Sequence, residues 1–300
     1  MGVYNGAANL RDSLESILTQ EGADLEFIVV NDGSTDESGK ILDEYAARDG
    51  RVRVIHQENR GLTAALISGC AAARGRFIAR QDAGDLSMKG RLREELSYAL
   101  AHDDAALVSC GTRFVGPAGE HLYDVLQNDG DADEGLKTLD RKEARGPSHH
   151  GCTLFPKALY EGVGGYRSAF YYGQDLDLWL RFAEHGRHYV VPAILYQGTI
   201  TAGSLSGLFR KEQDQLTAIM IEAADLRRKG KSEDPALERA RGVGQGGKKR
   251  AGRIAYARAN YFIGACLRKR GDRRAGNYFK EALRMFPLHA RSWYGLIVGR

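Results

Sequence analysis

Three acidic segments of the sequence carry residue types that could act on phosphates and hydroxyl groups. The first, residues 31–36 (NDGSTD), follows the apolar run at residues 25–30. Ligands of open α/β sheets bind beyond the carboxyl ends of strands, so Asp32 could accept hydrogen bonds from a nucleoside base or ribose. The same residues could instead form an ordinary turn whose Asp and Ser cap the next helix.

The second acidic segment, residues 80–85 (RQDAGD), also comes directly after a short apolar run, Phe77–Ala79. Asp82 and Asp85 could together hold a hard divalent cation, Mn²⁺ or Mg²⁺, and such a cation bridges diphosphate oxygens. A helix-capping loop is the alternative. Because both acidic segments follow strands that we expect to be parallel, we expect them at the same edge of the sheet.

The third segment combines residues 164–167 (GGYR) with residues 174–181 (QDLDLWLR). Asp175 and Asp177 stand at the start of a predicted helix, where an aspartate can serve as a cap or as a general base. Two residues along a helix correspond to a rotation of about 200°, so only one of them can face a given site. Trp179 is expected in the core.

Strands alternate with helices along the first half of the chain, which predicts an α/β fold with a mostly parallel sheet flanked by helices. Helical spacing begins at Leu10, and a turn at residues 117–120 indicates mixed strands in the second half. The expected strands cover residues 25–31, 52–55, 77–79, 105–110 and 190–196.

Composition limits the functional classes. The chain has 300 residues, of which 43% are hydrophobic and 27% are charged, as in globular proteins. Its four cysteines form no CxxC pair, which argues against a zinc site and fits a reducing cytosol. No apolar run approaches the ~20 residues that span a bilayer, and no signal core is present. We therefore expect a cytoplasmic protein and leave attachment to a membrane surface open.

Charge is distributed unevenly. Residues 205–300 contain 22 Lys and Arg against 9 Asp and Glu, whereas the rest of the chain has an acidic excess. The basic part could contact anionic lipid head groups or form a solvated helical surface. It lacks an aromatic-interleaved RNA motif, so we expect no nucleic-acid partner.

The pattern divides the chain into four parts. We expect an α/β domain that carries the acidic segments, a helical extension, a linker rich in Gly and Lys, and a tetratricopeptide-like helical hairpin. These parts cover residues 1–215, 216–241, 242–252 and 253–300, respectively.

The three acidic segments, in this order and spacing, resemble glycosyltransferase family 2. The resemblance runs from residue 2 to about residue 215 and includes Tyr4, Asn5 and residues 13–20 (SLESILTQ). It implies the GT-A fold for residues 1–215, as a nucleotide-sugar-binding catalytic domain, and inverting transfer of a sugar from a nucleotide-diphosphosugar, with a UDP-sugar favoured, to an acceptor hydroxyl. The acceptor would be a saccharide or a lipid-linked molecule in the synthesis of cell-surface polysaccharide or glycolipid.

The resemblance also implies roles for individual residues. Asp175 would be the catalytic base, and Asp82 and Asp85 would carry the metal. The donor nucleotide would be bound by Val3, Tyr4, Asp32, Ser34 and Asp82. The acceptor or the diphosphate would be contacted by His149, His150 and Gln174, with residues 196–206 as an active-site loop.

Three departures from the family pattern leave alternatives open. Position 84 is glycine where the metal loop usually has aspartate, and Gln174 replaces a usual glutamate. The chain starts at MGVYN, so the first strand should be almost wholly missing, and we expect upstream codons to encode it. A catalytically inactive nucleotide-sugar-binding protein is one alternative. A nucleotidyltransferase is another, although no glycine-rich basic loop is visible near the N-terminus.

Overall fold

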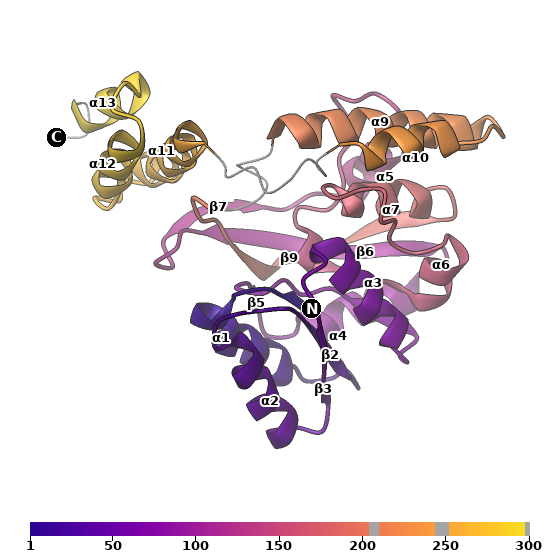
Figure 1. The fold of residues 1–300 in the computed structure, drawn as a ribbon. Helices are drawn as coiled ribbons and strands as arrows, with labels where there is room; N and C mark the ends of the chain where they lie inside the picture. The colour runs from indigo at the N-terminus through magenta and orange to yellow at the C-terminus, as the bar shows by residue number, and fades with distance from the viewer. Residues whose placement is uncertain (204–209, 244–251, 298–300) are drawn as a thin grey trace.

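The computed structural model describes residues 1–203, 210–243 and 252–297 (Figure 1). Its N-terminal part is a parallel sheet in the order β1-β2-β3, formed by β1 (Gly2–Val3), β2 (Phe27–Asp32) and β3 (Val52–Gln57). The first strand is thus two residues long, with Gly2 opposite Val30. Every residue of β2 is buried, as expected for an inner parallel strand covered on both faces.

Helices cover both faces of this sheet. The helices are α1 (Ala7–Leu18), α2 (Ser38–Arg48) and α3 (Leu62–Ala72). Leu10, Leu14 and Leu42 of α1 and α2 pack with Val29 on one face. On the other face, Gly69 of α3 approaches Val30 so closely that an added Cβ would lie 3.4 Å from its side chain.

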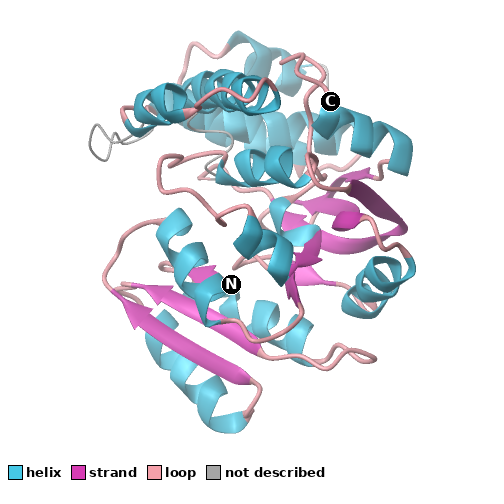
Figure 2. Ribbon diagram, turned by 90° about the vertical axis from the view of Figure 1, so that its right-hand side faces the viewer, coloured by secondary structure: helices cyan, strands magenta, loops and turns pink. Residues whose placement is uncertain are grey.

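The second sheet has the order β4-β8-β6-β9-β5, with β7 paired to β6. Its strands are β4 (Phe77–Ala79), β5 (Leu86–Ser87), β6 (Ala105–Val115), β7 (His121–Val125), β8 (Thr153–Pro156) and β9 (Arg187–Thr199). Helices flank both sheets (Figure 2), which confirms the predicted α/β class.

The first sheet is parallel and the second is mixed, as the turn at residues 117–120 indicated for the second half of the chain. Among the described residues, three strand pairs are parallel and four are antiparallel. The short strands β4, β5 and β8 carry too few residues to reveal their direction. Only the β6–β7 hairpin could be expected from its turn.

Seven helical segments connect and cover the second sheet. They are α4 (Arg91–Ala101), α5 (Asp129–Lys137), η1 (His150–Cys152), α6 (Lys157–Gly162), α7 (Gln174–Phe182), α9 (Arg210–Arg228) and α10 (Asp234–Arg241). The expected boundary at residue 215 falls inside α9. Side chains of α9 and α10, including Met220 and Ala236, pack on Phe170 and Leu180 around α7. Within the described ranges, no helix is long and apolar enough to cross a membrane.

Three helices form the C-terminal tail: α11 (Arg253–Lys269), α12 (Ala275–Met285) and α13 (Ala290–Ile297). The pair α11–α12 corresponds to the predicted hairpin, and α13 is an addition to it. The tail packs on the β6–β7 hairpin, where Leu122 joins its core and Tyr278 donates a hydrogen bond to Glu120 at 2.7 Å. Most of the predicted linker, residues 244–251, lies outside the described residues.

Phe279 is at the centre of the tail. Its ring is buried, and a Cβ added at Gly264 or Gly295 would lie 2.8 Å from it. Replacing Phe279 by Ala should destabilise the tail by about 3–5 kcal/mol, because a buried aromatic side chain is lost and a cavity remains. Limited proteolysis should then cleave within residues 253–297 at protease concentrations that spare the parent. The exposed Phe262 provides the control, and equal sensitivity of Phe262→Ala would contradict this account.

Candidate active site

Asp82, Asp85 and His149 form a cluster beyond the end of β4. One ligand-type atom from each residue lies within 4.8 Å of the other two. The Nε2 atom of His149 is 3.4 Å from Asp85 Oδ2, and its Nδ1 atom is 3.9 Å from Asp82 Oδ2. The fold therefore adds an imidazole to the two carboxylates that the sequence suggested for a metal.

Residues of β9 fix the Asp85 carboxylate. The Tyr196 hydroxyl donates to its Oδ2 at 2.9 Å, and the Thr199 backbone N–H donates to its Oδ1 at 2.8 Å. Burial raises the pKa of Asp85 to about 6, and the negative charge of Asp82 adds to this effect while His149 opposes it. Asp85 is thus a rigid ligand candidate that a cation would keep ionised.

Arg80 determines the state of Asp82. Burial of Asp82 disfavours its charge, but the Arg80 guanidinium, 2.6 Å from Oδ1, and His150 lower its pKa to about 2. The Arg80 side chain is itself almost fully buried. The sequence had indicated nothing about this buried ion pair. Breaking such a pair is costly, so Asp82 contributes to stability as well as to the candidate site.

His150 has a different position from His149. Its Nε2 atom accepts a hydrogen bond from Arg80 Nε at 3.2 Å and lies 2.7 Å from the Tyr166 hydroxyl oxygen. Burial, followed by the positive charge of Arg80, moves the pKa of His150 well below its usual value. His150 therefore orients Arg80 from the protein interior, and His149 alone of the two faces the acidic cluster.

Gly84, the departure from the family pattern, lies in this loop with φ +91°, a conformation that favours glycine. A Cβ added there would have no heavy atom within 4 Å. The backbone of the loop is tied to α1, because Gly84 N–H donates to Ser13 Oγ at 2.9 Å and Ser13 Oγ donates to Asp85 O at 2.8 Å. The loop thus keeps its shape without the usual carboxylate at position 84.

Asp32 lies at the end of β2 and holds the chain after β3. It accepts hydrogen bonds from Gln57 Nε2 at 2.7 Å, from Arg60 N–H at 3.0 Å and from Gly61 N–H at 2.8 Å. With its oxygens engaged in this way, Asp32 shapes the predicted nucleoside pocket by positioning residues 60–61.

The other predicted donor-binding residues lie near the start of the chain. Val3 is buried in the core under α1, whereas Tyr4 is exposed and could stack on a base. Ser34 accepts a hydrogen bond from Asn5 N–H at 3.0 Å, which joins this segment to the loop after β2.

Asp175 and Asp177 have different environments at the start of α7. Asp177 is buried and pairs with Arg181 at 2.6 Å and with Arg167 at 3.5 Å. Asp175 is partly buried, and Leu176 N–H donates to its Oδ1 at 2.9 Å. Burial raises the pKa of Asp175, and the nearby charge of Asp82 raises it further. Asp175 is therefore within electrostatic reach of the acidic cluster, while Asp177 is engaged by arginines in the interior.

Gln174, the first residue of α7, is buried. Sequence reasoning did not identify the roles of Arg80, Tyr196 and Thr199 around the cluster. Arg80 was visible as a charge immediately after a strand, two residues before Asp82. The contacts of Tyr196 and Thr199 with Asp85 span more than 110 residues and have no local signal.

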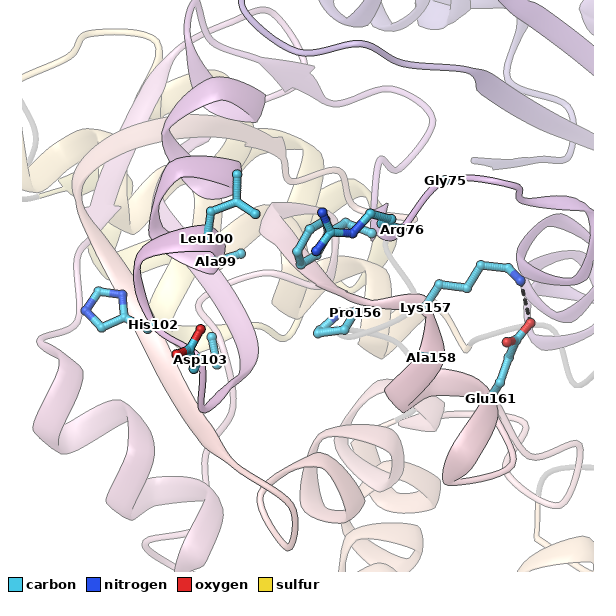
Figure 3. A pocket seen from close by; sticks show the side chains of 12 residues that line it. Gly75, Arg76, Ala99, Leu100, His102, Asp103, Pro156, Lys157, Ala158 and Glu161 are labelled. Carbon is cyan, nitrogen blue, oxygen red and sulfur yellow. Dashed lines mark hydrogen bonds and ion pairs between the residues drawn. The ribbon is translucent and has the colours of Figure 1, made fainter.

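A cavity of about 560 Å³ lies elsewhere, at the opposite end of β4 (Figure 3). Its lining includes Arg76, His102, Lys157 and Glu161, and the last two form an ion pair at 2.5 Å. None of the predicted site residues lines this cavity, so it is distinct from the acidic cluster.

A helix-flanked α/β sheet with an acidic cluster beyond a strand end defines a glycosyltransferase of the GT-A type. The family model described as glycosyl transferase family 2 matches residues 1–162, and the chain belongs to this family. It is a glycosyltransferase, which decides against the nucleotidyltransferase alternative.

Relatives by sequence include the putative glycosyltransferases EpsE and EpsH of Bacillus subtilis. EpsE is 32% identical over 205 residues, covering 66% of this chain and 70% of EpsE. EpsH is 36% identical over 163 residues, covering 54% of this chain and 47% of EpsH. The chain therefore spans less than half of EpsH and more than two thirds of EpsE.

Two solved structures share the fold. The S. aureus TarS 1–349 structure aligns with a TM-score of 0.56 at 15% identity, covering 99% of this chain and 88% of that chain. The mannosyltransferase PcManGT from Pyrobaculum calidifontis, in complex with GDP-Man and Mn²⁺, aligns with a TM-score of 0.57 at 17% identity, covering 99% and 84%.

Proposed function

We propose that the protein transfers a sugar, with inversion of configuration, from a nucleotide-diphosphosugar to a hydroxyl group of a saccharide or lipid-linked acceptor. The carrying observation is that Asp82 and His149 of the acidic cluster both act electrostatically on Asp175, whereas Asp177 is paired with arginines. One available carboxylate is what a single displacement needs. A retaining hydrolase would use two carboxylates that flank the scissile bond.

The nature of the donor is a further part of the proposal. TarS has been solved with UDP and with UDP-GlcNAc, and PcManGT with GDP-Man. UDP-GlcNAc and GDP-Man are nucleotide sugars, and UDP is the nucleotide part of such a donor, which supports a donor of this class. We favour a UDP-sugar, with the exposed Tyr4 against the base and the loop held by Asp32 beside it. A role in the synthesis of cell-surface polysaccharide or glycolipid would follow from such a donor and acceptor.

The residues of the cluster fit a divalent cation. Two carboxylates and one imidazole within 4.8 Å are a donor set suited to Mn²⁺, with Mg²⁺ as the alternative. Asp82 and Asp85 would hold the ion through the oxygens that face His149. A bound cation would neutralise the charge that develops on the departing diphosphate.

The remaining steps belong to the residues of the chain itself. Asp175 would accept the proton of the attacking hydroxyl, and its place at the N-terminus of α7 favours its ionised form. Arg80 keeps Asp82 ionised, while Tyr196 and Thr199 hold Asp85 in place. These contacts preorganise the site before the donor arrives.

A donor screen tests the proposal. Thermal shift with UDP- and GDP-sugars, with and without Mn²⁺, should reveal one donor whose stabilising effect requires the metal. That donor should then release nucleoside diphosphate on addition of acceptors, and NMR should show an inverted anomeric configuration in the product. A retained configuration would contradict the single displacement. Metal-dependent binding without turnover on any acceptor would favour the catalytically inactive alternative.

A further inference from the structure

Exposed apolar side chains gather on the C-terminal tail. Of eleven large hydrophobic residues that are exposed in the described chain, seven belong to residues 253–297. Four of them have the highest exposure in the tail: Leu288 (81%), Ile297 (70%), Tyr294 (61%) and Trp293 (53%). We refer to these four residues as the apolar tip. An apolar concentration of this kind on a surface marks an interaction site.

The apolar tip is one side of an amphipathic helix. In α13, Ile297 lies four residues after Trp293 and three after Tyr294, so the three side chains are neighbours on the helix surface. Trp293 Nε1 donates to Pro287 O at 2.8 Å, which holds the indole beside the turn that carries Leu288. The opposite side of α13 is buried through Gly295, next to Phe279. Figure 1 shows α12 and α13 at one end of the molecule, away from the two sheets.

Positive charges border the apolar tip. Residues 253–297 contain ten Lys and Arg against two Asp and Glu. Both acids are already paired, Asp272 with Arg274 and Glu281 with Arg284. The Arg268 guanidinium lies 5.8 Å from the centre of the Tyr294 ring.

Arg258 of α11 and Arg291 of α13 are both exposed. Both act electrostatically on His289, the residue after Leu288: burial, followed by these two charges, lowers the pKa of His289. No carboxylate in the described part of the chain pairs with either arginine. The tail therefore combines the exposed aliphatic and aromatic groups of the apolar tip with arginines that no carboxylate of the described residues neutralises.

We propose that the tail docks on an anionic lipid surface through the apolar tip and the arginines around it. Trp and Tyr are enriched at membrane–water interfaces, and basic residues near the surface are attracted to anionic head groups. The side chains of the apolar tip favour a lipid surface over a nucleic acid or a second copy of the tail. The aliphatic Leu288 and Ile297 can enter hydrocarbon but can neither stack on bases nor bind phosphate. A second copy of the tail would bring a second cationic surface against the first.

This surface is structurally joined to the candidate site. Thr199, which donates to Asp85, is followed by Ile200, and Ile200 packs against the core of α11 and α12. The rings of His149, Phe114, Tyr123 and Phe262 follow one another at centroid distances of 5.8, 4.8 and 6.1 Å. Docking would therefore hold the candidate site near acceptors carried on lipids. This consequence rests on the proposed function, whereas the docking of the tail on a lipid surface does not depend on it.

Flotation of the full chain with vesicles tests the proposal. We expect the protein to float with vesicles of phosphatidylcholine mixed with phosphatidylglycerol, to float less at high salt, and to stay behind with phosphatidylcholine alone. The Leu288→Ser, Ile297→Ser variant should bind about tenfold more weakly, because less apolar surface is buried. The Arg258→Gln, Arg291→Gln variant should lose about 30-fold in binding and most of the salt dependence.

The matched control is Leu100→Ser, Leu126→Ser, which removes two exposed leucines elsewhere and should float like the parent. Thermal unfolding of every variant verifies that the tail remains folded. The proposal is overturned if the protein does not float with anionic vesicles. It is also overturned if the Leu288→Ser, Ile297→Ser variant and the Arg258→Gln, Arg291→Gln variant both float like the parent. Tip-dependent binding of a single-stranded oligonucleotide, or tip-dependent self-association, without any vesicle binding overturns it as well. Sugar transfer to a soluble acceptor, measured without vesicles, tests the proposed function independently of docking. A failure of docking and a failure of the proposed function are therefore distinguishable.

Discussion

The Asp82→Asn, Asp85→Asn double variant is expected to lose metal-dependent donor binding while its fold persists. Two negative charges disappear from the cluster around His149, and neutral amides are poor ligands for Mn²⁺. We expect the affinity for UDP in the presence of Mn²⁺ to fall by about 10²-fold or more, because loss of an outer-shell partner alone costs 10–100-fold. Calorimetric titration of UDP with and without Mn²⁺ measures the difference.

Asparagine is preferred to alanine because of a contact that the sequence did not reveal. Asp82 lies in a loop, but its partner Arg80 is buried, so the carboxylate compensates a positive charge in the interior. Alanine at position 82 would leave that guanidinium unpaired, at a cost of about 3–5 kcal/mol. An asparagine oxygen can still accept its hydrogen bond.

The control for this experiment removes two negative charges elsewhere in the N-terminal part. Asp12 and Asp24 are exposed, so Asp12→Asn, Asp24→Asn should bind UDP and Mn²⁺ like the parent. If the Asp82→Asn, Asp85→Asn variant also binds like the parent, the metal site is not at this cluster.

The local part of the fold was predictable because its signals are short-range. A buried apolar run followed by acidic and small residues identifies a strand end, and this placed Asp32 at the end of β2 and Asp82 in the loop after β4. Helix starts were equally readable, as for Asp175 at the first turn of α7. Each of these inferences depends on fewer than about ten consecutive residues.

The contacts between distant segments were not predictable. Tyr196 reaches Asp85 because β9 pairs with β5, and nothing in a two-residue strand such as Leu86–Ser87 announces its partner. His149 joins the cluster because it lies in the loop before β8. The antiparallel direction of β8 depends on the order of the strands in the sheet, which a local pattern does not contain. The helix α13 was missed because its apolar residues are exposed and therefore form no stripe facing a core.

The relation between Asp175 and Asp177 is the point at which the structure adds most to the sequence. The sequence offered two carboxylates at one helix start, with opposite orientations as the only distinction. In the structure, Asp177 is buried between Arg181 and Arg167. A carboxylate buried between two arginines is unavailable to a substrate, which leaves Asp175 as the candidate for proton transfer.

Asp175→Asn should therefore reduce turnover by about 10²–10⁴-fold with donor affinity nearly unchanged, because the amide keeps the shape of the side chain but cannot take a proton. The rate of nucleoside diphosphate release at saturating donor and acceptor measures this effect, and UDP binding in the presence of Mn²⁺ verifies the donor site. Asp177→Asn is the matched comparison. It should lower the thermal unfolding midpoint, because Arg181 loses its buried counter-ion, while the folded fraction remains active. Parent-like turnover in Asp175→Asn, together with an inactive but stable Asp177→Asn, would transfer the role of base to Asp177.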